Sequence, residues 1–293
     1  MAILVGPETR VVCQGMTGRA GTFHAARMLS YGTKLVAGVT PGKGGRMHLD
    51  LPVFDRVADA VRETGANASI VFVPPTGAAA AILEAIDAGV ELVVCVTERV
   101  PVLDVVRVRQ ALEGSKTRLV GPNTQGILVP GVTQIGVMST VDARPGRIGI
   151  VSRSASLTSE IVLQTTLAGL GQSTTIGVGG DPIHGVGLKD CVELFIDDPE
   201  TDGIIVIGEI GGNEEEEVAA LVKRVRSPKP IVGYVAGRHA PPERRMGHAG
   251  AFATGAGGGA AHKIAVLRGA GVRIVNDASR VGETMRKALA GED

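Results

Sequence analysis

The sequence predicts two doubly wound α/β domains. Short apolar runs rich in β-branched residues alternate with segments of helical length and periodicity, and this alternation starts afresh near the middle of the chain. The apolar runs lack any alternation of polar and apolar residues, as expected of parallel strands that helices cover on both faces. With 293 residues, 44% of them hydrophobic and 20% charged, the chain is long and apolar enough for two globular cores.

In the first half, the pattern predicts five strands that alternate with four helices. The expected strands are Val11–Gln14, Leu35–Thr40, Ser69–Val73, Leu92–Thr97 and Arg118–Gly121, and the expected helices lie near Gly21–Tyr31, Arg56–Thr64, Ala78–Ala88 and Leu103–Glu113. The stretch 122–146 is rich in Gly and Pro and weak in periodicity, which indicates a connection between domains. We place the boundary at Gly126, so that the predicted domains are residues 1–126 and 127–293.

The second half repeats the pattern. Strands are expected at Ile148–Ser152, Ser173–Val178, Ile204–Ile207, Ile231–Val235 and Arg273–Val275, and helices near Ser156–Ala168, Leu188–Ile196, Glu214–Arg226, Ala260–Gly269 and Ser279–Ala290. Ligands of doubly wound sheets bind at the carboxyl ends of the strands. Both domains are therefore expected to carry functional residues in the loops that follow their strands.

Composition excludes several classes of function. Thirty basic and thirty acidic side chains balance, and aromatic residues make up 2% with no Trp, so neither a basic surface nor base-stacking platforms for nucleic acid are expected. No segment has the pattern of a signal peptide or a membrane span. The cysteines Cys13, Cys95 and Cys191 have no metal-ligand or disulfide spacing. We expect a cytoplasmic protein with no metal site of its own and no nucleic-acid or membrane partner.

The loop after the first strand is a candidate phosphate site. Gly15, Gly18 and Gly21 recur at three-residue spacing before and into a helix, whose N-terminal N–H groups are open to an anion. The next strand leads into Thr40-Pro41-Gly42-Lys43-Gly44-Gly45, a second Gly-rich loop, and into no acidic residue that would hold a ribose. The two loops fit a phosphorylated nucleotide better than a nicotinamide dinucleotide. Plain turns with a solvated lysine are the alternative.

A hydroxyl and a carboxylate follow the fourth strand, in Val96-Thr97-Glu98. Two interpretations of Glu98 stand beside each other. It belongs to the ligand site at this edge of the sheet, or it begins the next helix as a first-turn acid stabilised by the helix dipole.

The strongest candidate for chemistry is His248, in Arg245-Met246-Gly247-His248-Ala249-Gly250-Ala251. Its small neighbours let the backbone approach a ligand closely, and a neutral imidazole is a nucleophile near physiological pH. A covalent phosphohistidine is therefore chemically reasonable. A loop histidine with its ring in water is the alternative.

Other strand ends of the second domain carry groups that suit phosphate chemistry at His248. Ser154 and Ser156 begin a helix, where hydroxyls and free N–H groups favour an anion. Glu209 follows the third strand and can accept a hydrogen bond from Nδ1–H of His248, which leaves Nε2 free to attack phosphorus. A loop carboxylate that faces water is the alternative for Glu209.

Taken together, these motifs resemble the α subunits of the succinyl-CoA synthetase family, which includes the malate–CoA ligases. The resemblance runs over essentially the whole chain, and its most specific part is the loop 245–251. Further matching segments are Val12-Cys13-Gln14-Gly15, the run from Gly38 to Gly45, Gly179-Gly180-Asp181-Pro182-Ile183 and Gly208-Glu209-Ile210-Gly211-Gly212, with Gly237 and Ala240 upstream of the histidine. The resemblance implies a Rossmann-like CoA-binding domain followed by a flavodoxin-like ligase domain that carries the phosphohistidine loop.

The resemblance also implies roles for individual residues. His248 would carry phosphate and Glu209 would orient it, while Ser154, Ser156 and Ser159 would lie at the acyl substrate and phosphate. The implied contacts of CoA are Thr17, Gly18, Arg19, Ala20, Lys43, Val96, Thr97 and Glu98. In that family a separate ATP-grasp β subunit binds the nucleotide, so ATP or GTP and Mg²⁺ are expected on a partner; no Walker loop is visible in this chain.

The implied reaction is that of a nucleotide-dependent acid–CoA ligase. A small carboxylic acid is converted to its acyl phosphate, His248 takes or returns the phosphoryl group according to direction, and the CoA thiol attacks the activated acyl group. The covalent intermediate divides one hard displacement into easier steps.

Several motifs around the acyl substrate depart from the family pattern. The usual Ser-Gly-Thr-Leu-Thr-Tyr is Ser154-Ala155-Ser156-Leu157-Thr158-Ser159, so that Ser159 replaces a tyrosine. The usual Asn-Cys-Pro-Gly is Asn123-Thr124-Gln125-Gly126, Thr-Glu-Gly-Ile-Pro is Thr97-Glu98-Arg99-Val100-Pro101, and the loop 136–140 lacks the family's Pro-Gly. These changes predict that succinate is not the best substrate. They also motivate an alternative function, a catalytically altered CoA-binding regulatory paralogue.

Overall fold

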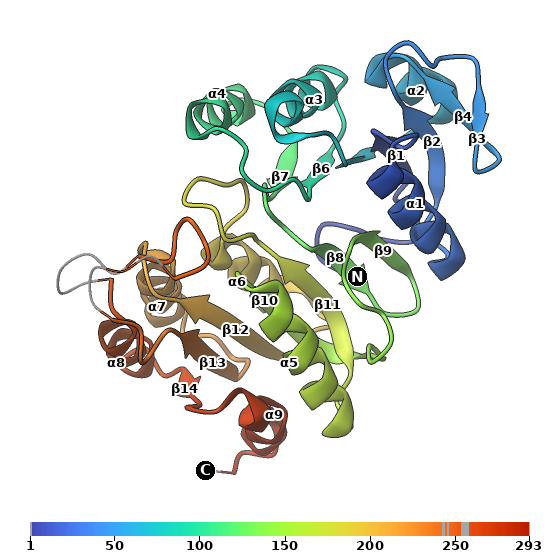
Figure 1. Cartoon of the computed structure of the whole chain (residues 1–293). Coiled ribbons are helices and arrows are strands. Elements are labelled where there is room, and N and C mark those ends of the chain that lie inside the picture. The colour runs from blue at the N-terminus through green and yellow to red at the C-terminus, as the bar shows by residue number, and fades with distance from the viewer. Residues whose placement is uncertain (1, 242–243, 245, 253–257, 293) are drawn as a thin grey trace. The chain divides into compact units, whose positions relative to one another are not determined.

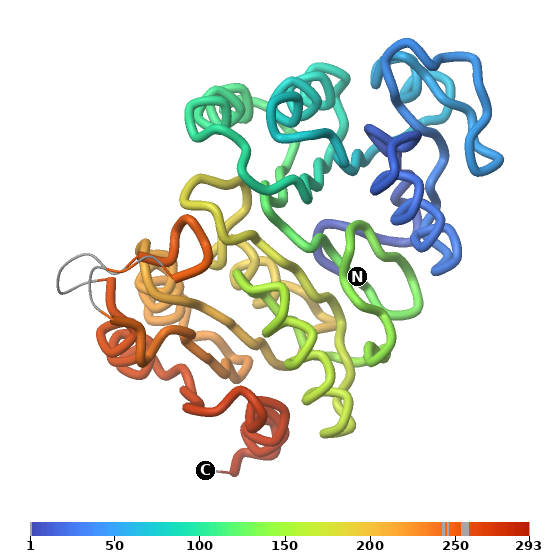
Figure 2. The backbone as a smooth tube through the Cα atoms, viewed as in Figure 1, coloured from blue at the N-terminus to red at the C-terminus, as the bar shows by residue number. Residues whose placement is uncertain are grey.

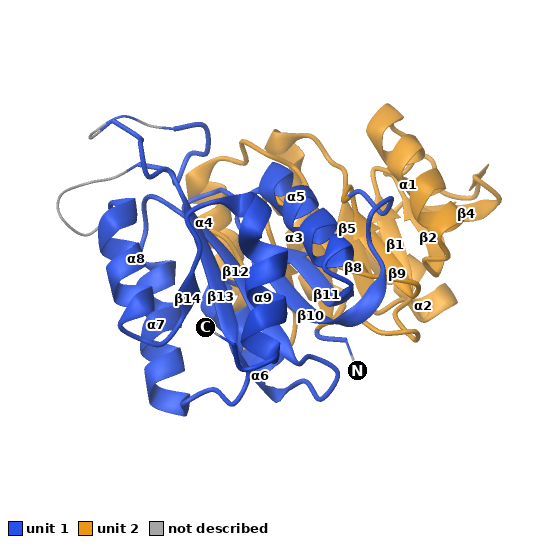
Figure 3. Cartoon of the chain, turned by 90° about the horizontal axis from the view of Figure 1, so that it is seen from below, with its two compact units in different colours: residues 1–3, 139–182, 187–293 blue, residues 4–138, 183–186 orange. Residues whose placement is uncertain are grey.

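The computed structural model describes residues 2–241, 244, 246–252 and 258–292 (Figures 1 and 2). The chain divides into two compact units, which Figure 3 colours separately. We call residues 4–138 and 183–186 the N-terminal unit, and residues 1–3, 139–182 and 187–293 the C-terminal unit. The boundary predicted at Gly126 falls inside the N-terminal unit, at the first residue of strand β8.

The N-terminal unit alternates strands and helices along the chain. Its strands are β1 (Val11–Gln14), β2 (Leu35–Val39), β3 (Met47–His48), β4 (Leu51–Phe54), β5 (Ala68–Val71), β6 (Leu92–Cys95), β7 (Arg118–Val120), β8 (Gly126–Val129) and β9 (Thr133–Gly136), and its helices are α1 (Arg19–Tyr31), α2 (Val57–Thr64), α3 (Pro75–Asp87) and α4 (Val102–Leu112). The main sheet has the order β3-β4-β2-β1-β5-β6-β7, and only β3 runs antiparallel to its neighbour. Without β3 this is the Rossmann order.

Helices cover both faces of this sheet. Right-handed crossovers place α2, α3 and α4 in series on one face and α1 on the other (Figure 1). The strands β1, β5 and β6 are buried along their whole length, which is why they are apolar without alternation. The antiparallel hairpins β3–β4 and β8–β9 had no counterpart in the predicted pattern, because that pattern consisted of strands that alternate with helices, and no helix separates the two strands of either hairpin.

The C-terminal unit repeats the α/β pattern with another strand order. Its strands are β10 (Pro145–Ser152), β11 (Gln172–Gly177), β12 (Gly203–Glu209), β13 (Ile231–Ala236) and β14 (Arg273–Ile274), and its helical segments are α5 (Ala155–Leu167), α6 (Leu188–Asp197), α7 (Glu214–Val225), α8 (Ala260–Arg268), the 3₁₀ turn η1 (Ala278–Arg280) and α9 (Val281–Leu289). The strands lie in the order β14-β13-β12-β10-β11 and run parallel. This is the flavodoxin-like order, so both predicted fold classes are confirmed.

The register of the C-terminal sheet brings four strand ends to one edge. Ser152 at the end of β10 lies opposite Gly177 of β11 and Ile207 of β12, and Glu209 at the end of β12 lies opposite Ala236 of β13. Helices α5 and α9 cover one face of this sheet, while α6, α7 and α8 pack in series on the other. The loops that leave this edge therefore converge. In the described part of the chain, no helix is long and apolar enough to cross a membrane.

Candidate active site

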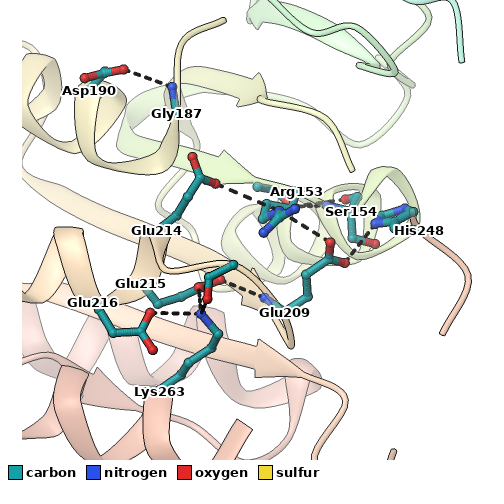
Figure 4. A network of polar contacts seen from close by, with 12 residues as sticks. Arg153, Ser154, Gly187, Asp190, Glu209, Glu214, Glu215, Glu216, His248 and Lys263 are labelled. Atoms are coloured by element: carbon teal, nitrogen blue, oxygen red, sulfur yellow. Dashed lines mark hydrogen bonds and ion pairs between the residues drawn. The ribbon is translucent and has the colours of Figure 1, made fainter. Parts of the chain in front are cut away.

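His248 and Glu209 meet at the carboxyl edge of the C-terminal sheet. Glu209 is the last residue of β12, and His248 lies in the loop between β13 and α8. Nδ1 of His248 lies 2.8 Å from Oε2 of Glu209 (Figure 4). A carboxylate only accepts, so Nδ1 carries the hydrogen and Nε2 keeps its lone pair in the neutral ring. The alternatives that placed either side chain in open water are wrong: the imidazole is 32% exposed and the Glu209 side chain 8%.

The second oxygen of Glu209 faces a buried cation. Nε of Arg153 lies 3.3 Å from Oε1 of Glu209 and 3.9 Å from Oε2 of Glu214, and its side chain is only 3% exposed. Arg153 follows β10 directly, and its backbone N–H donates to the carbonyl of Ile207 on β12. The Glu209 carboxylate is therefore held between a permanent cation and a titratable ring.

The pKa of His248 is raised above its ordinary value. The main cause is the hydrogen bond to Glu209, which favours the protonated ring, and the charge of Glu209 acts in the same direction. Burial and the charge of Arg153 oppose this increase. The neutral ring, which is the nucleophilic form, therefore predominates only at a higher pH than for a free histidine.

Glycines shape the loop that carries the histidine. A Cβ at Gly180, in the loop after β11, would lie 2.4 Å from Cγ of His248, so only glycine leaves room for the ring. Gly250 donates its N–H to the carbonyl of Gly180, and Ala251 donates to the carbonyl of His248, which closes a turn around the histidine. Gly247 in that turn has a φ of +72°, which favours glycine. Arg245 of the motif lies outside the described residues.

The three predicted serines lie at the start of α5. Ser154 is the N-cap of this helix, and its Oγ accepts from the N–H of Leu157 at 3.4 Å. Its Oγ also lies 3.4 Å from that of Ser156, which is exposed. Ser159 is exposed on the next turn and donates back to the carbonyl of Ala155 at 3.5 Å. The helix thus presents two hydroxyls near its N-terminus, and Ser159 one turn further along.

A second candidate site lies wholly within the N-terminal unit. A pocket of about 670 Å³ opens at the carboxyl ends of β1 and β2, between the two predicted phosphate loops. Its lining includes five residues predicted to bind CoA, namely Thr17, Gly18, Arg19, Ala20 and Lys43. Nζ of Lys43 donates to Oγ1 of Thr17 at 3.0 Å, which joins the two loops. The lysine is therefore partly buried at a ligand-sized pocket, which favours the phosphate-site interpretation over a plain turn.

Close packing explains the glycine spacing beside this pocket. A Cβ at Gly21 in the first turn of α1 would lie 2.1 Å from the carbonyl oxygen of Gly15, and Gly15 itself has a φ of +78°. Gly18 is the N-cap of α1, without a side chain to occupy the first N–H groups. The loop therefore leaves backbone donors open at a helix N-terminus, as a phosphate requires.

The remaining predicted CoA contacts do not line this pocket. Oγ1 of Thr97 donates to the carbonyl of Val73, a lining residue, at 2.7 Å, while Val96 is half-buried. The side chain of Glu98 is 65% exposed and pairs loosely with the exposed Arg99. Glu98 does not begin a helix, because α4 starts only at Val102 and has Asp104 as its first-turn acid. The helix-start interpretation is therefore wrong, and the assignment of Glu98 to the ligand site stays a prediction.

Three charged residues linked to Glu209 had no expected role: Arg153 pairs with its carboxylate, Glu215 accepts its N–H, and Lys263 binds Glu215. Arg153 was visible only as one member of a Ser-Arg-Ser run, and Glu215 only as part of the acidic start of a helix. Lys263 lies in an alanine-rich helix with no feature that marks it. All three side chains are buried. Among the residues that the structure describes, no group of three or more His, Cys, Asp or Glu side chains is arranged to hold a metal ion.

Comparison with known proteins gives the same division of the chain. The family model described as a CoA binding domain matches residues 7–99, and the one described as CoA-ligase matches residues 151–273. Among solved structures, ATP citrate lyase from Methanothrix soehngenii, in complex with citrate and coenzyme A, matches with a TM-score of 0.88 at 23% identity. The match covers 99% of this chain and 51% of that longer one, and at this identity it shows a shared fold.

Curated relatives match nearly from end to end. The α subunit of the ADP-forming succinate–CoA ligase of Aquifex aeolicus (strain VF5) is 50% identical over 291 residues, which cover 99% of this chain and 95% of the relative. The α subunit 2 of the same enzyme in Archaeoglobus fulgidus is 49% identical over 99% of this chain and 100% of the relative. The counterpart in Staphylococcus aureus (strain Mu50 / ATCC 700699) is 46% identical over 98% and 95%. With both domains matched at this identity, the chain belongs to the family of succinate–CoA ligase α subunits.

Proposed function

We propose that this chain is the catalytic α subunit of an acid–CoA ligase in which His248 carries a phosphoryl group. The observation that carries the proposal is the 2.8 Å hydrogen bond from Nδ1 of His248 to Glu209, on a ring that remains one-third exposed. It leaves Nε2 as the only ring nitrogen able to attack. The membership of the succinate–CoA ligase family supports the same reaction class.

In the transfer step, the lone pair of Nε2 attacks the phosphorus of a phosphoanhydride or an acyl phosphate. An Nε2–P bond forms and a P–O bond breaks, and its electron pair leaves with the departing oxygen. Positive charge grows on the imidazole as the bond forms. Glu209, fixed at Nδ1–H, stabilises that charge and requires no reorganisation during the step. In one direction, transfer of the phosphoryl group from His248 to the carboxylate substrate gives the acyl phosphate, and in the other direction His248 takes the group back. The CoA thiol attacks the acyl phosphate.

The N-terminus of α5 is the proposed phosphate-binding element. Ser154 and Ser156 offer hydroxyls there, and the first N–H groups of the helix point out of its N-terminus. Catalysis of phosphoryl transfer depends chiefly on positioning and on electrostatic stabilisation, both of which a helix N-terminus supplies. Ser159, one turn further along, is proposed to face the acyl substrate, a small carboxylic acid.

The pocket of the N-terminal unit is the proposed CoA site. Thr17, Gly18, Arg19 and Ala20 would bind phosphate groups through the backbone and side chains at the start of α1, and Lys43 would supply an ammonium. Val96, Thr97 and Glu98 would contact the part of CoA that extends beyond the pocket. The match of residues 7–99 to the CoA-binding domain family supports this assignment.

The full reaction is proposed to require an ATP-grasp β subunit. That partner would bind ATP or GTP with Mg²⁺, as the resemblance implies, and would complete the acyl site. The relatives are named as α subunits, which supports the need for a partner. A cytoplasmic location is proposed with it, because the free, buried thiols of Cys13, Cys95 and Cys191 suit a reducing compartment.

The test is phosphorylation of the full-length chain in the presence of a candidate β subunit and γ-³²P-labelled ATP or GTP. The proposal expects acid-labile, base-stable label on His248, and release of that label when a carboxylic acid and CoA are added. Absence of label under all conditions, with CoA binding retained, would instead support the regulatory paralogue and overturn the ligase assignment.

A further inference from the structure

A buried ion pair adjoins the backbone of Glu209. Lys263 of α8 and Glu215 of α7 have side chains that are 0% exposed, and Nζ of Lys263 lies 2.5 Å from Oε2 of Glu215 (Figure 4). Nζ also donates to Oε2 of Glu216 at 2.9 Å and to the carbonyl of Gly212 at 3.0 Å. The three hydrogens of the ammonium thus match three acceptors.

The second oxygen of Glu215 binds the backbone at the end of strand β12. Oε1 of Glu215 accepts the backbone N–H of Glu209 at 2.9 Å. The approach is possible because residue 208 is glycine: a Cβ there would lie 2.3 Å from this oxygen. One carboxylate therefore bridges the Lys263 ammonium and the amide of the residue that binds His248.

The same cation joins the two loops that form the active site. The Lys263 ammonium binds the carbonyl of Gly212 in the turn after β12 directly. It binds the amide of Glu209 indirectly, through the Glu215 carboxylate. Helix α8 follows the histidine loop, and Gly258 just before that helix accepts the N–H of Gly211. Lys263 therefore fixes the Glu209 turn to the helix that begins where the histidine loop ends.

Stability alone is a poor reason for this arrangement. Desolvation of two charges is unfavourable, and apolar residues of similar size often serve a core equally well. Burial raises the pKa of Glu215, and the charge and hydrogen bond of Lys263 oppose that increase. The pair is thus costly to keep charged and is satisfied only in this geometry.

We propose that the Lys263–Glu215 pair is a positioning device that holds the Glu209 carboxylate against His248. This inference rests on the proposed function in that His248 is the reacting residue. Without the bridge, the amide of Glu209 loses its acceptor and the turn after β12 loses its anchor on α8. The hydrogen bond to Nδ1 then loosens, and the imidazolium loses part of its stabilisation.

The test compares two carboxylates that bind the same ammonium. Glu215→Gln replaces one of the two carboxylate oxygens by an NH2 group, which cannot accept a hydrogen bond, so that either Lys263 or the Glu209 N–H loses its acceptor. Glu216→Gln is the matched control, because it also removes one negative charge from Lys263 but has no contact with the Glu209 amide. The titration of His248 is followed by ¹⁵N NMR of the imidazole in the full-length chain, with His248→Asn to assign its signal among the six histidines.

In Glu215→Gln, the pKa of His248 is expected to fall toward its ordinary value. With the β subunit, kcat is expected to drop roughly tenfold or more with little change in the KM for CoA, because small displacements of catalytic groups cost about this much. In Glu216→Gln, both readouts are expected to stay close to wild type. Equal effects of the two substitutions, or a folded Glu215→Gln with wild-type titration and kcat, would overturn the proposal.

A double variant covers the case in which Glu215→Gln does not fold. Lys263→Met with Glu215→Gln removes both charges of the pair, so that neither is left buried without its partner. The proposal expects this variant to fold, with the pKa of His248 lowered toward its ordinary value and kcat reduced, because the turn after β12 has lost its anchor on α8. A double variant that folds and keeps the wild-type titration and kcat contradicts it. The NMR titration is independent of phosphorylation, so failure of this proposal is distinguishable from failure of the phosphohistidine, which the labelling experiment tests.

Discussion

The two oxygens of the Glu209 carboxylate contact different side chains: Oε2 lies 2.8 Å from Nδ1 of His248, and Oε1 lies 3.3 Å from Nε of Arg153. The arrangement fixes the carboxylate from both sides, and the charges of Glu209 and Arg153 act on the pKa of His248 in opposite directions. Glu209 raises the pKa of His248, while the charge of Arg153 acts in the opposite direction. The ring is thereby held through Nδ1, which leaves Nε2 free for the proposed attack.

Substitution His248→Asn should abolish net ligation and leave CoA binding unchanged. The amide has similar bulk but cannot form a stable phosphoramidate, and the proposed CoA pocket lies in the other unit of the chain. Ligation assays with the β subunit and calorimetry with CoA check the two halves of this prediction. Full ligase activity in the variant would end the phosphohistidine mechanism.

The pH dependence of phosphorylation should shift when Glu209 is neutralised. His248 has a raised pKa, so the attacking neutral ring is lost as the pH falls through that value. Glu209→Gln removes the largest cause of the increase and lowers the pKa, so the acid limb of the rate profile should move to lower pH. The maximal rate should fall as well, because the developing imidazolium loses its counter-charge.

The measurement is the rate of phosphate incorporation across the pH range in wild type and in Glu209→Gln. Asp202→Asn is a suitable control, since this carboxylate pairs with Arg147 on the surface. An acid limb that stays in place, or that moves to higher pH, contradicts the assigned role of Glu209.

Substitution Lys43→Ala should weaken CoA binding. Its ammonium lines the pocket and donates to Thr17, and the loss of a charge-assisted contact to a phosphate costs about 1.5–3 kcal/mol, or roughly ten- to hundredfold in affinity. Lys34→Ala is the control, because Lys34 pairs with Glu8 on the surface and is not among the lining residues. Unchanged CoA affinity by calorimetry in Lys43→Ala would place the ligand elsewhere.

Substitution Gly180→Ala should reduce catalysis far more than it reduces stability. The added methyl group would lie 2.4 Å from the His248 ring and must displace it. A displacement of this kind costs roughly ten- to hundredfold in kcat. At Gly6, where an added Cβ meets nothing within 4 Å, alanine should leave kcat unchanged. Equal kcat in the two variants shows that the ring position is not limiting.

Succinate should not be the best substrate. Ser159 stands where the family pattern has a tyrosine, and the exposed serine removes an aromatic wall from the proposed acyl site. Loss of one apolar contact changes discrimination by about 1–3 kcal/mol, so weak activity with succinate should remain. A panel of mono- and dicarboxylic acids, assayed with the β subunit in wild type and Ser159→Tyr, checks this. The idea fails when succinate has the highest kcat/KM and the tyrosine leaves the ranking unchanged.

Local sequence patterns were sufficient for the architecture. β-Branched runs and helical periodicity depend on residues close in the chain, and the main strands and helices lie within a few residues of their predicted limits. β1 at Val11–Gln14 has its predicted bounds, whereas the 3₁₀ turn η1 and α9 together fill the predicted helix Ser279–Ala290. His248 and Glu209 were also predictable, because residues at the carboxyl ends of parallel strands share one edge of a sheet.

Only the tertiary structure decided which charged residues are buried and paired near the candidate active site. Glu209 and His248 are 39 residues apart and Glu215 and Lys263 are 48 apart, so each contact depends on which strands and helices become neighbours. In the sequence, Glu214–Glu217 is the acidic first turn that a helix dipole favours, and nothing there separates the buried Glu215 from its partly exposed neighbour Glu216. The sequence by itself therefore determined the fold and pointed to His248, the proposed reacting residue, and to its carboxylate partner Glu209. Burial and pairing between residues far apart in the sequence arise only when the sheet assembles. They decided that Arg153 pairs with Glu209 and that Glu215 links the Glu209 amide to Lys263.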